Sequence, residues 1–175
     1  QRRPKAADAD ALPALLATCG DDPQGRRDRL LILLLADTGA RASELAGLAV
    51  ADLRTDLAGA VVRGKGGKER RVWFHPLTVA ALRSWLEVRP GGPWLFPSRC
   101  GHLLANGLGQ MLGRRAGLAG ISGVINPHSW RHWHAMGYLR AGGDIVSLSE
   151  ALGHSDLTVT REYLRWSADD LQELH

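Results

Sequence analysis

A run of seven apolar residues, Leu30–Ala36, constrains the fold of this chain more than any other feature. The run lies within a segment, 26–37, that predicts a helix ended by Gly39. A helix with so little polar surface must be surrounded by other elements, so we expect it at the centre of a folded domain. The run is much too short to cross a bilayer. With 175 residues, of which 45% are hydrophobic, the chain suits one ordinary globular domain.

Helical patterns flank a central stretch of short strands. The helices expected before it cover 11–18, 26–37 and 42–48, and those after it cover 77–88, 105–116, 129–140, 145–152, 158–164 and a last segment from 168. Three segments between them are partly β-branched and separated by turn residues: 50–53, 60–63 and 70–74. The predicted fold class is therefore mainly α with a small three-stranded antiparallel β-sheet.

The amino-acid composition restricts the class of protein less than the order of predicted helices and strands does. Residues 1–9 are polar and charged, so we expect a linker there and one domain over 10–175. This opening does not resemble a signal peptide, and Cys19 and Cys100 lack the spacing of a metal or redox motif. Both observations predict a cytoplasmic protein with two reduced thiols. The net charge of +4 is compatible with nucleic-acid binding, although many soluble proteins carry as much.

A first candidate anion site lies in the segment 126–132. Its opening Asn-Pro pair predicts a helix start, which places His128 and Arg131 on one face of the first turn. A guanidinium, an imidazole and free backbone N–H groups at a helix N-terminus together suit a phosphate. A surface arginine beside a packed histidine is the alternative. A zinc site that includes His132 is disfavoured, because Ser129 stands where a metalloprotease helix carries Glu.

Two further candidate groups lie upstream. Arg41 stands at a predicted helix start with Glu44 three residues on. Arg41 could grip a phosphate while Glu44 holds it in place, or the two could form an ordinary exposed ion pair. The segment 64–68 predicts a flexible hairpin turn, which either offers Lys65 and Lys68 to a nucleic-acid backbone or is an exposed basic turn. It does not have the pattern of a nucleotide-binding P-loop.

The last candidates lie near the C-terminal end. Tyr163, one of two tyrosines, follows His154 by nine residues. Taken singly, the tyrosine suits half-buried packing and the histidine suits a helix cap. In order along the chain, however, arginines that neutralise a phosphodiester precede a tyrosine that can attack it. This order favours cutting and rejoining of DNA through a phosphotyrosine link.

These blocks together resemble the tyrosine recombinases, also called the phage-integrase family. The resemblance extends from about Asp10 to Tyr163 and includes four blocks in the family's order: Thr38–Leu45, Gly64–Arg70, His128–His132, and Leu152–His154 followed by Tyr163. Trp130 and Trp133 stand where the family more often has Leu and Thr. We expect them to alter packing near the site and to leave the chemistry unchanged.

The resemblance implies an active site that needs no metal, cofactor or ATP. Its catalytic residues would be Arg41, Lys65, His128, Arg131, His154 and Tyr163, with Glu44 in support and Lys68, Arg70 and His132 as DNA contacts. Tyr163 would form a 3′-phosphotyrosyl link, and Lys65 would protonate the leaving 5′ oxygen. We expect both arginines to act on the phosphate more than on the fold.

The resemblance also implies partners. Double-stranded DNA would be the substrate, no membrane would be involved, and the full-length protein would act as a homotetramer on DNA. The family usually carries an N-terminal core-binding domain, so residues 1–9 would be the end of its linker and the isolated domain would be a monomer. The segment after Tyr163 would dock on a neighbouring protomer or on its own domain.

Three other functions remain open from the sequence. A non-catalytic DNA-binding relative would have lost a catalytic position, and none is lost here. A type IB topoisomerase-like nicking and closing enzyme shares the same chemistry, so the residues alone do not separate it from a recombinase. A helical protein-interaction domain would not need the ordered Arg, Lys, His, Arg, His, Tyr series.

Overall fold

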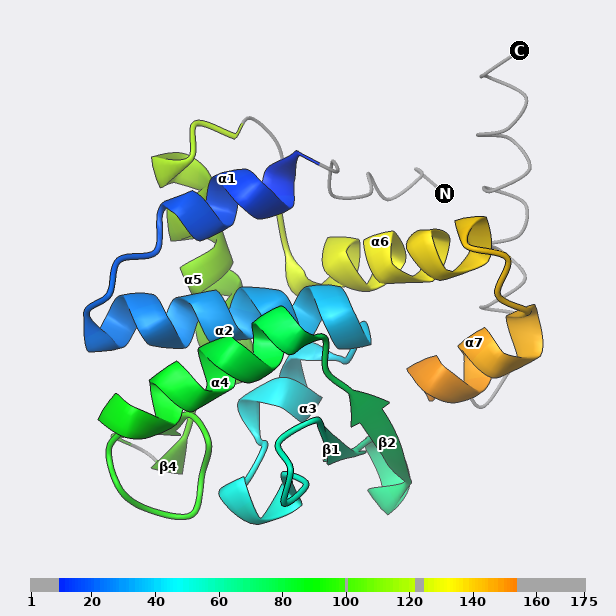
Figure 1. The fold of residues 1–175 in the computed structure, drawn as a ribbon, viewed down its shortest axis with the longest axis horizontal. Helices are drawn as coiled ribbons and strands as arrows, with labels where there is room; N and C mark the ends of the chain where they lie inside the picture. Colours follow the sequence, from blue (N-terminus) through cyan, green and yellow to red (C-terminus); the bar gives the residue numbers. More distant parts are fainter. Residues whose placement is uncertain (1–9, 100, 122–124, 154–175) are drawn as a thin grey trace.

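The computed structural model describes residues 10–99, 101–121 and 125–153, which form a helical domain around one long central helix (Figure 1). Its elements in chain order are α1 (Ala11–Ala17), α2 (Pro23–Thr38), α3 (Ala42–Ala46), the 3-10 turn η1 (Val50–Asp52), β1 (Gly59–Arg63), the 3-10 turn η2 (Lys65–Gly67), β2 (Glu69–Trp73), α4 (Pro76–Val88), β3 (Pro97–Ser98), β4 (Gly101–His102), α5 (Ala105–Leu118), α6 (Pro127–Arg140) and α7 (Ile145–Leu152). None of the helices in these ranges is long and apolar enough to cross a membrane.

The leucine-rich helix α2 is the centre of the domain, as its sequence predicts. All residues of Leu30–Ala36 are buried, and α1, α4, α5 and α6 pack around them (Figure 1). The helix begins earlier than expected, at Pro23, because the carboxylate of Asp22 accepts the backbone N–H groups of residues 24–25 at 3.0 and 3.1 Å. It ends at Gly39, whose left-handed φ of 55° suits glycine.

The prediction of a three-stranded sheet is wrong in its first strand. Strands β1 and β2 form a two-stranded antiparallel sheet, and β3 and β4 form a second, two-residue pair. The segment 50–53 instead opens with the turn η1, and only its last residue, Leu53, pairs through its backbone with β1, in an isolated bridge to Ala60. The carboxylate of Asp52 accepts the backbone N–H of Ala49 at 2.9 Å. This local hydrogen bond competes with strand pairing.

The hydrophobic core is divided unequally between two clusters. The large cluster surrounds α2 and includes Trp130 together with the stacked rings of Trp85 and Phe96, whose centroids lie 6.4 Å apart. Helices α6 and α7 share a second cluster whose buried members are Ala135, Met136, Leu148 and Leu152. Because α7 buries so little apolar surface, polar contacts must contribute more to holding it against the domain.

A buried ion pair joins three helices of the large cluster. Asp28 of α2 is fully buried, and its two carboxylate oxygens accept from the guanidinium groups of Arg27 and of Arg115 on α5, at 2.8 Å each. Arg115 also donates to the carbonyl of Thr18, just after α1, at 2.6 Å. These contacts tie α1, α2 and α5 together and leave the buried carboxylate paired on both of its oxygens.

Candidate active site

Arg41 and Glu44 form a local pair at the start of α3. Arg41 stands at the N-cap position, and the Glu44 carboxylate accepts its backbone N–H at 2.8 Å and its Nη1 at 3.0 Å. The side chain of Glu44 is 1% exposed, whereas that of Arg41 is 40% exposed. The alternative of an ordinary exposed ion pair therefore does not describe Glu44, because its carboxylate is buried and only the guanidinium of Arg41 reaches the surface.

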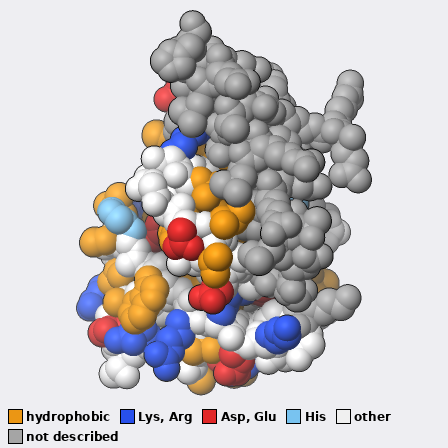
Figure 2. Space-filling view, turned by 90° about the vertical axis from the view of Figure 1, so that its right-hand side faces the viewer, with side chains coloured by type: hydrophobic (Ala, Val, Ile, Leu, Met, Phe, Trp, Pro, Cys, Tyr) orange, Lys and Arg blue, Asp and Glu red, His pale blue; other side chains and the backbone are white. Residues whose placement is uncertain are grey.

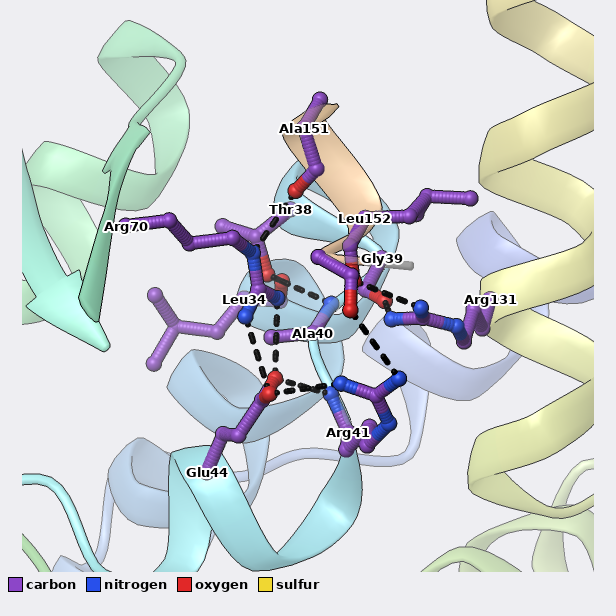
Figure 3. Close-up of polar contacts among 11 residues, drawn as sticks. Leu34, Thr38, Gly39, Ala40, Arg41, Glu44, Arg70, Arg131, Ala151 and Leu152 are labelled. Atoms are coloured by element: carbon purple, nitrogen blue, oxygen red, sulfur yellow. Dashed lines mark hydrogen bonds and ion pairs between the residues drawn. The ribbon is translucent and has the colours of Figure 1, made fainter. Parts of the chain in front are cut away.

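The charge of Glu44 is shared between two arginines. Arg70 of β2 donates Nη1 and Nη2 to the two carboxylate oxygens of Glu44, at 2.8 Å each (Figure 3). Burial alone would raise the pKa of Glu44, but hydrogen bonds from Arg70 and from the backbone N–H of Arg41 outweigh this effect and hold the pKa below its ordinary value. Glu44 is therefore ionised at neutral pH, and the three groups together carry an excess of positive charge.

Arg131 reaches the same place from α6. Its buried guanidinium donates Nη1 to the carbonyl of Gly39 at 2.7 Å and Nη2 to the carbonyl of Leu152 at 2.6 Å. The first bond ties α6 to the end of α2, and the second ties it to the end of α7. Arg41 donates Nη2 to the next carbonyl, that of Gly153, at 3.4 Å. The two arginines, far apart in sequence, therefore donate to neighbouring carbonyls of one short segment, 152–153 (Figure 3).

A hollow of about 390 Å³ opens beside these arginines. Its lining comes from the N-terminal ends of α3, α5 and α6 and consists of Arg41, Ala42, Ala105, Asn126, Pro127, His128 and Arg131. Helix N-termini present free N–H groups and the positive end of the helix dipole. With two guanidinium groups and an imidazole on the same lining, the hollow has the chemistry of an anion site.

The start of α6 places His128 at this hollow. The side chain of Asn126 accepts the backbone N–H of Ser129 at 2.9 Å, and Pro127 occupies the first helical position. His128 is therefore in the first turn, where its side chain is exposed. His128 and Arg131 therefore both line this hollow, as their spacing on one helical turn predicts.

The hairpin turn between β1 and β2 packs against the Arg41–Glu44 pair. A Cβ atom added to Gly64 would lie 3.1 Å from Oε1 of Glu44, so the base of the turn touches the carboxylate. The two glycines after Lys65 have φ of 77° and 74°, which L side chains rarely adopt. Lys68 is exposed. The structure describes the backbone of Lys65, in η2, but not its side chain.

Two residues predicted to contact DNA have little exposed surface. The Arg70 side chain is 11% exposed and His132 is buried at 4%, so each offers little of itself to an outside ligand. Strand alternation explains Arg70, because it lies on the same face of β2 as the buried Val72, whereas Arg71 points the other way and is exposed. This alternation was a readable signal in the sequence, and it places Arg71 on the outer face instead.

Basic side chains also gather on the outer surface of the hairpin. Seen from the side on which α7 and β2 lie, Lys and Arg side chains are concentrated at the lower end of the described surface (Figure 2). The exposed basic residues of the hairpin and its neighbouring loop are Arg54, Arg63, Lys68 and Arg71. Arg54 and Arg63 form ion pairs with nearby carboxylates. Lys68 and Arg71 add further positive charge to this outer surface.

His154 and Tyr163 lie outside the described residues, as do the helices predicted over 158–164 and from 168. Gly153 directly precedes His154, and the carbonyls of Leu152 and Gly153 accept hydrogen bonds from the two arginines. The described chain therefore reaches the site at Gly153, the residue before His154.

Comparison with known proteins identifies the family. The model of the phage integrase family matches residues 5–169. The tyrosine recombinase XerD of Caulobacter vibrioides is 35% identical over 98% of this chain, and XerC of Pelobacter propionicus is 36% identical over all of it. This chain belongs to the phage integrase family. It spans 60% of the length of each of these two relatives.

Solved structures agree with this assignment. The crystal structure of the XerA recombinase superposes with a TM-score of 0.86 and 29% identity, over 99% of this chain and 63% of that one. The XerH site-specific recombinase bound to its palindromic difH substrate, in a post-cleavage complex, gives 0.80 and 26%, over 98% and 52%. The predicted mainly helical recombinase fold is thus confirmed, apart from the strand predicted over 50–53.

Proposed function

We propose that this chain is the catalytic domain of a tyrosine-type site-specific recombinase, which cleaves and rejoins strands of double-stranded DNA. The observation that carries the proposal is the hollow at the N-terminal ends of α3, α5 and α6, with Arg41, His128 and Arg131 on its lining. A phosphodiester is the anion that suits it, because two guanidinium groups can meet both non-bridging oxygens. Membership of the phage integrase family supports the same chemistry.

In the proposed reaction the phenol oxygen of Tyr163 attacks the scissile phosphorus. The new O–P bond makes a 3′-phosphotyrosyl enzyme, and the bond from phosphorus to the 5′ oxygen breaks. Arg41 and Arg131 offset the charge that builds on the non-bridging oxygens in the transition state. His128 accepts the tyrosine proton or orients the phosphate, and His154 donates a hydrogen bond to a non-bridging oxygen.

Lys65 supplies the proton that the leaving 5′ oxygen takes up. Its hairpin turn packs on Glu44, beside the exposed guanidinium of Arg41, so a lysine on this turn is close to the proposed phosphate position. The covalent intermediate conserves the energy of the phosphodiester bond. A second DNA 5′-hydroxyl can therefore reverse the reaction without ATP and complete a strand exchange.

Double-stranded DNA is the proposed partner, and a homotetramer on DNA is the proposed active assembly of the full-length protein. The XerH structure, a complex with its DNA substrate, supports the first of these proposals. The basic outer surface of the hairpin suits a phosphate backbone, whose contribution to affinity falls steeply as salt rises. The isolated domain is proposed to be a monomer that binds DNA weakly.

The test is formation of a covalent protein–DNA adduct by the protein expressed from its complete gene. The probe is a pool of duplexes with a randomised core and a nick, so that the short 5′-hydroxyl strand diffuses away after cleavage. We expect adducts that survive denaturation with the native protein and none with Tyr163→Phe, which removes the attacking oxygen but leaves DNA binding nearly intact.

Two other outcomes would replace the proposal. DNA binding without any adduct from the native protein would indicate a non-catalytic relative. Adducts accompanied by relaxation of supercoiled DNA, with no exchange between two copies of the recovered site, would indicate a nicking and closing enzyme.

A further inference from the structure

We propose that Arg70 is a positioning residue, which holds the catalytic hairpin and the end of α7 on the Arg41–Glu44 pair. This inference depends on the proposed function, because the hairpin and α7 lead to the groups assigned to catalysis. It replaces the DNA-contacting role that the sequence predicted for Arg70.

The geometry of Arg70 uses its whole guanidinium. Nη1 and Nη2 form a fork on the two oxygens of Glu44, at 2.8 Å each, and Nε donates to the carbonyl of Ala151 at 2.7 Å (Figure 3). The side chain is 11% exposed and its carboxylate partner 1%. A lysine could reach one of these acceptors as a point charge but could not reproduce the planar arrangement.

Three segments that carry proposed catalytic groups meet at this one guanidinium. Arg70 follows Lys65 by five residues on the hairpin, Glu44 binds Arg41, and Ala151 precedes His154 by three residues. A Cβ atom added to Gly153 would lie 3.3 Å from Nη1 of Arg70, so the end of α7 packs directly on it. The small apolar cluster between α6 and α7 does not extend to the hairpin, which makes the Arg70 contact the more important link there.

Arg70 also affects the charge that Arg41 presents to the hollow. Arg70 donates to both oxygens of the Glu44 carboxylate, Nη1 to one and Nη2 to the other. The guanidinium of Arg41 donates to Glu44 only through Nη1. Without Arg70 the buried carboxylate would have Arg41 as its partner. The positive charge of Arg41 would then be neutralised and its exposed guanidinium drawn inward, away from a bound phosphate.

The test compares Arg70→Lys with the matched control Arg115→Lys in the protein expressed from its complete gene. Arg115 is also 11% exposed, also binds a buried carboxylate and also donates to a backbone carbonyl, but it lies among α1, α2 and α5. Both variants keep the charge and are assayed below their melting temperatures.

We expect Arg70→Lys to lower the single-turnover rate of adduct formation at saturating DNA by about 10- to 100-fold, the scale of an ångström-sized misplacement. DNA affinity should remain unchanged, and Arg115→Lys should cleave at the native rate.

A second readout separates positioning from a loss of stability. In a substrate whose 5′ bridging oxygen is sulfur, the leaving group needs no proton, so part of the rate lost in Arg70→Lys should return if Lys65 has been displaced. A folding defect would not respond to the leaving group. No rescue, or equal rate losses in the two lysine variants, would overturn the proposal.

The remaining outcomes are also distinct. If Arg70→Lys binds DNA more weakly, with a lower salt dependence, but cleaves at the native rate at saturating DNA, then Arg70 contacts the DNA phosphate directly, as the sequence predicted, and the proposal is overturned. If Arg70→Lys does not fold, the double variant Glu44→Gln/Arg70→Gln removes both buried charges. A native cleavage rate in that double variant would overturn the proposal. Absence of adducts from the native protein would instead contradict the proposed function itself.

Discussion

In the part of the chain that the structure describes, two buried carboxylates are each bound by two arginines, and the two sites have different roles. Asp28 lies between Arg27 and Arg115, whose side chains are 27% and 11% exposed. Glu44 lies between Arg41 and Arg70, at 40% and 11%. The two sites share their chemistry, and in both the better buried arginine also donates to a backbone carbonyl.

The difference lies in what surrounds each pair. The Asp28 junction is buried on the central helix α2 and connects three helices. The Glu44 junction connects short segments, α3, the hairpin and the end of α7, and its more exposed arginine borders the hollow with His128 and Arg131. The same arrangement of charges therefore holds the core together at one place and orients a reactive surface at the other.

The largest expected effect is on stability at the Asp28 junction. Asp28→Asn leaves two guanidinium groups beside a neutral side chain, so the free energy of unfolding should fall by about 3 kcal/mol. Urea denaturation measures this loss. The cleavage rate per folded molecule should remain native, and a rate that falls together with stability would contradict the separation of the two junctions.

Removal of either arginine at the hollow should chiefly affect the chemical step. Arg41→Ala and Arg131→Ala should each raise its barrier by about 2–4 kcal/mol, as for a lost oxyanion donor. Only Arg131→Ala should also lower the melting temperature, because the buried guanidinium binds the carbonyls of Gly39 and Leu152. Single-turnover adduct formation and thermal melting test the pair together. Equal melting temperatures for the two variants would show that these carbonyl contacts contribute little.

Glu44 should make stability depend on pH in acid. Despite burial, bonds from Arg70 and Arg41 lower its pKa in the folded state, so its stabilising contribution is complete above the ordinary Glu value and is lost as pH falls through the lowered pKa. Glu44→Gln should therefore be less stable than the native protein at pH 6, with a difference that shrinks as pH falls below about 4.3. Denaturation curves measured at several pH values would contradict this if the difference were constant.

The smallest expected effect concerns the more exposed arginine of the Asp28 junction. Arg27→Ala should lower the free energy of unfolding by less than about 1 kcal/mol, because Arg115 still binds Asp28 and Arg27 is partly screened by solvent. Cleavage should be native. Its counterpart Arg41→Ala should lower the free energy of unfolding equally little but should nearly abolish cleavage. If Arg27→Ala also lost its cleavage activity, the contrast between the two junctions would be wrong.

Much of the architecture could be predicted because its signals are local. The apolar run in α2 placed that helix at the centre, and α7 has the predicted bounds because Asp144 caps its start and Gly153, with a left-handed φ of 66°, ends it. The first strand could not be predicted, since the β-branched residue at Val50 was outweighed by the hydrogen bond between Asp52 and Ala49.

By itself, the sequence determined the family's motif order, the central helix and the pairing of His128 with Arg131 on one helical turn. These depend on residue type and on spacings within one element. Only the tertiary structure decided that Arg70 faces Glu44 and that Arg131 binds the carbonyls of Gly39 and Leu152. A guanidinium can donate to any acceptor oxygen that the fold brings within reach, so its partner depends on segments that are distant in sequence and meet only when the chain is folded.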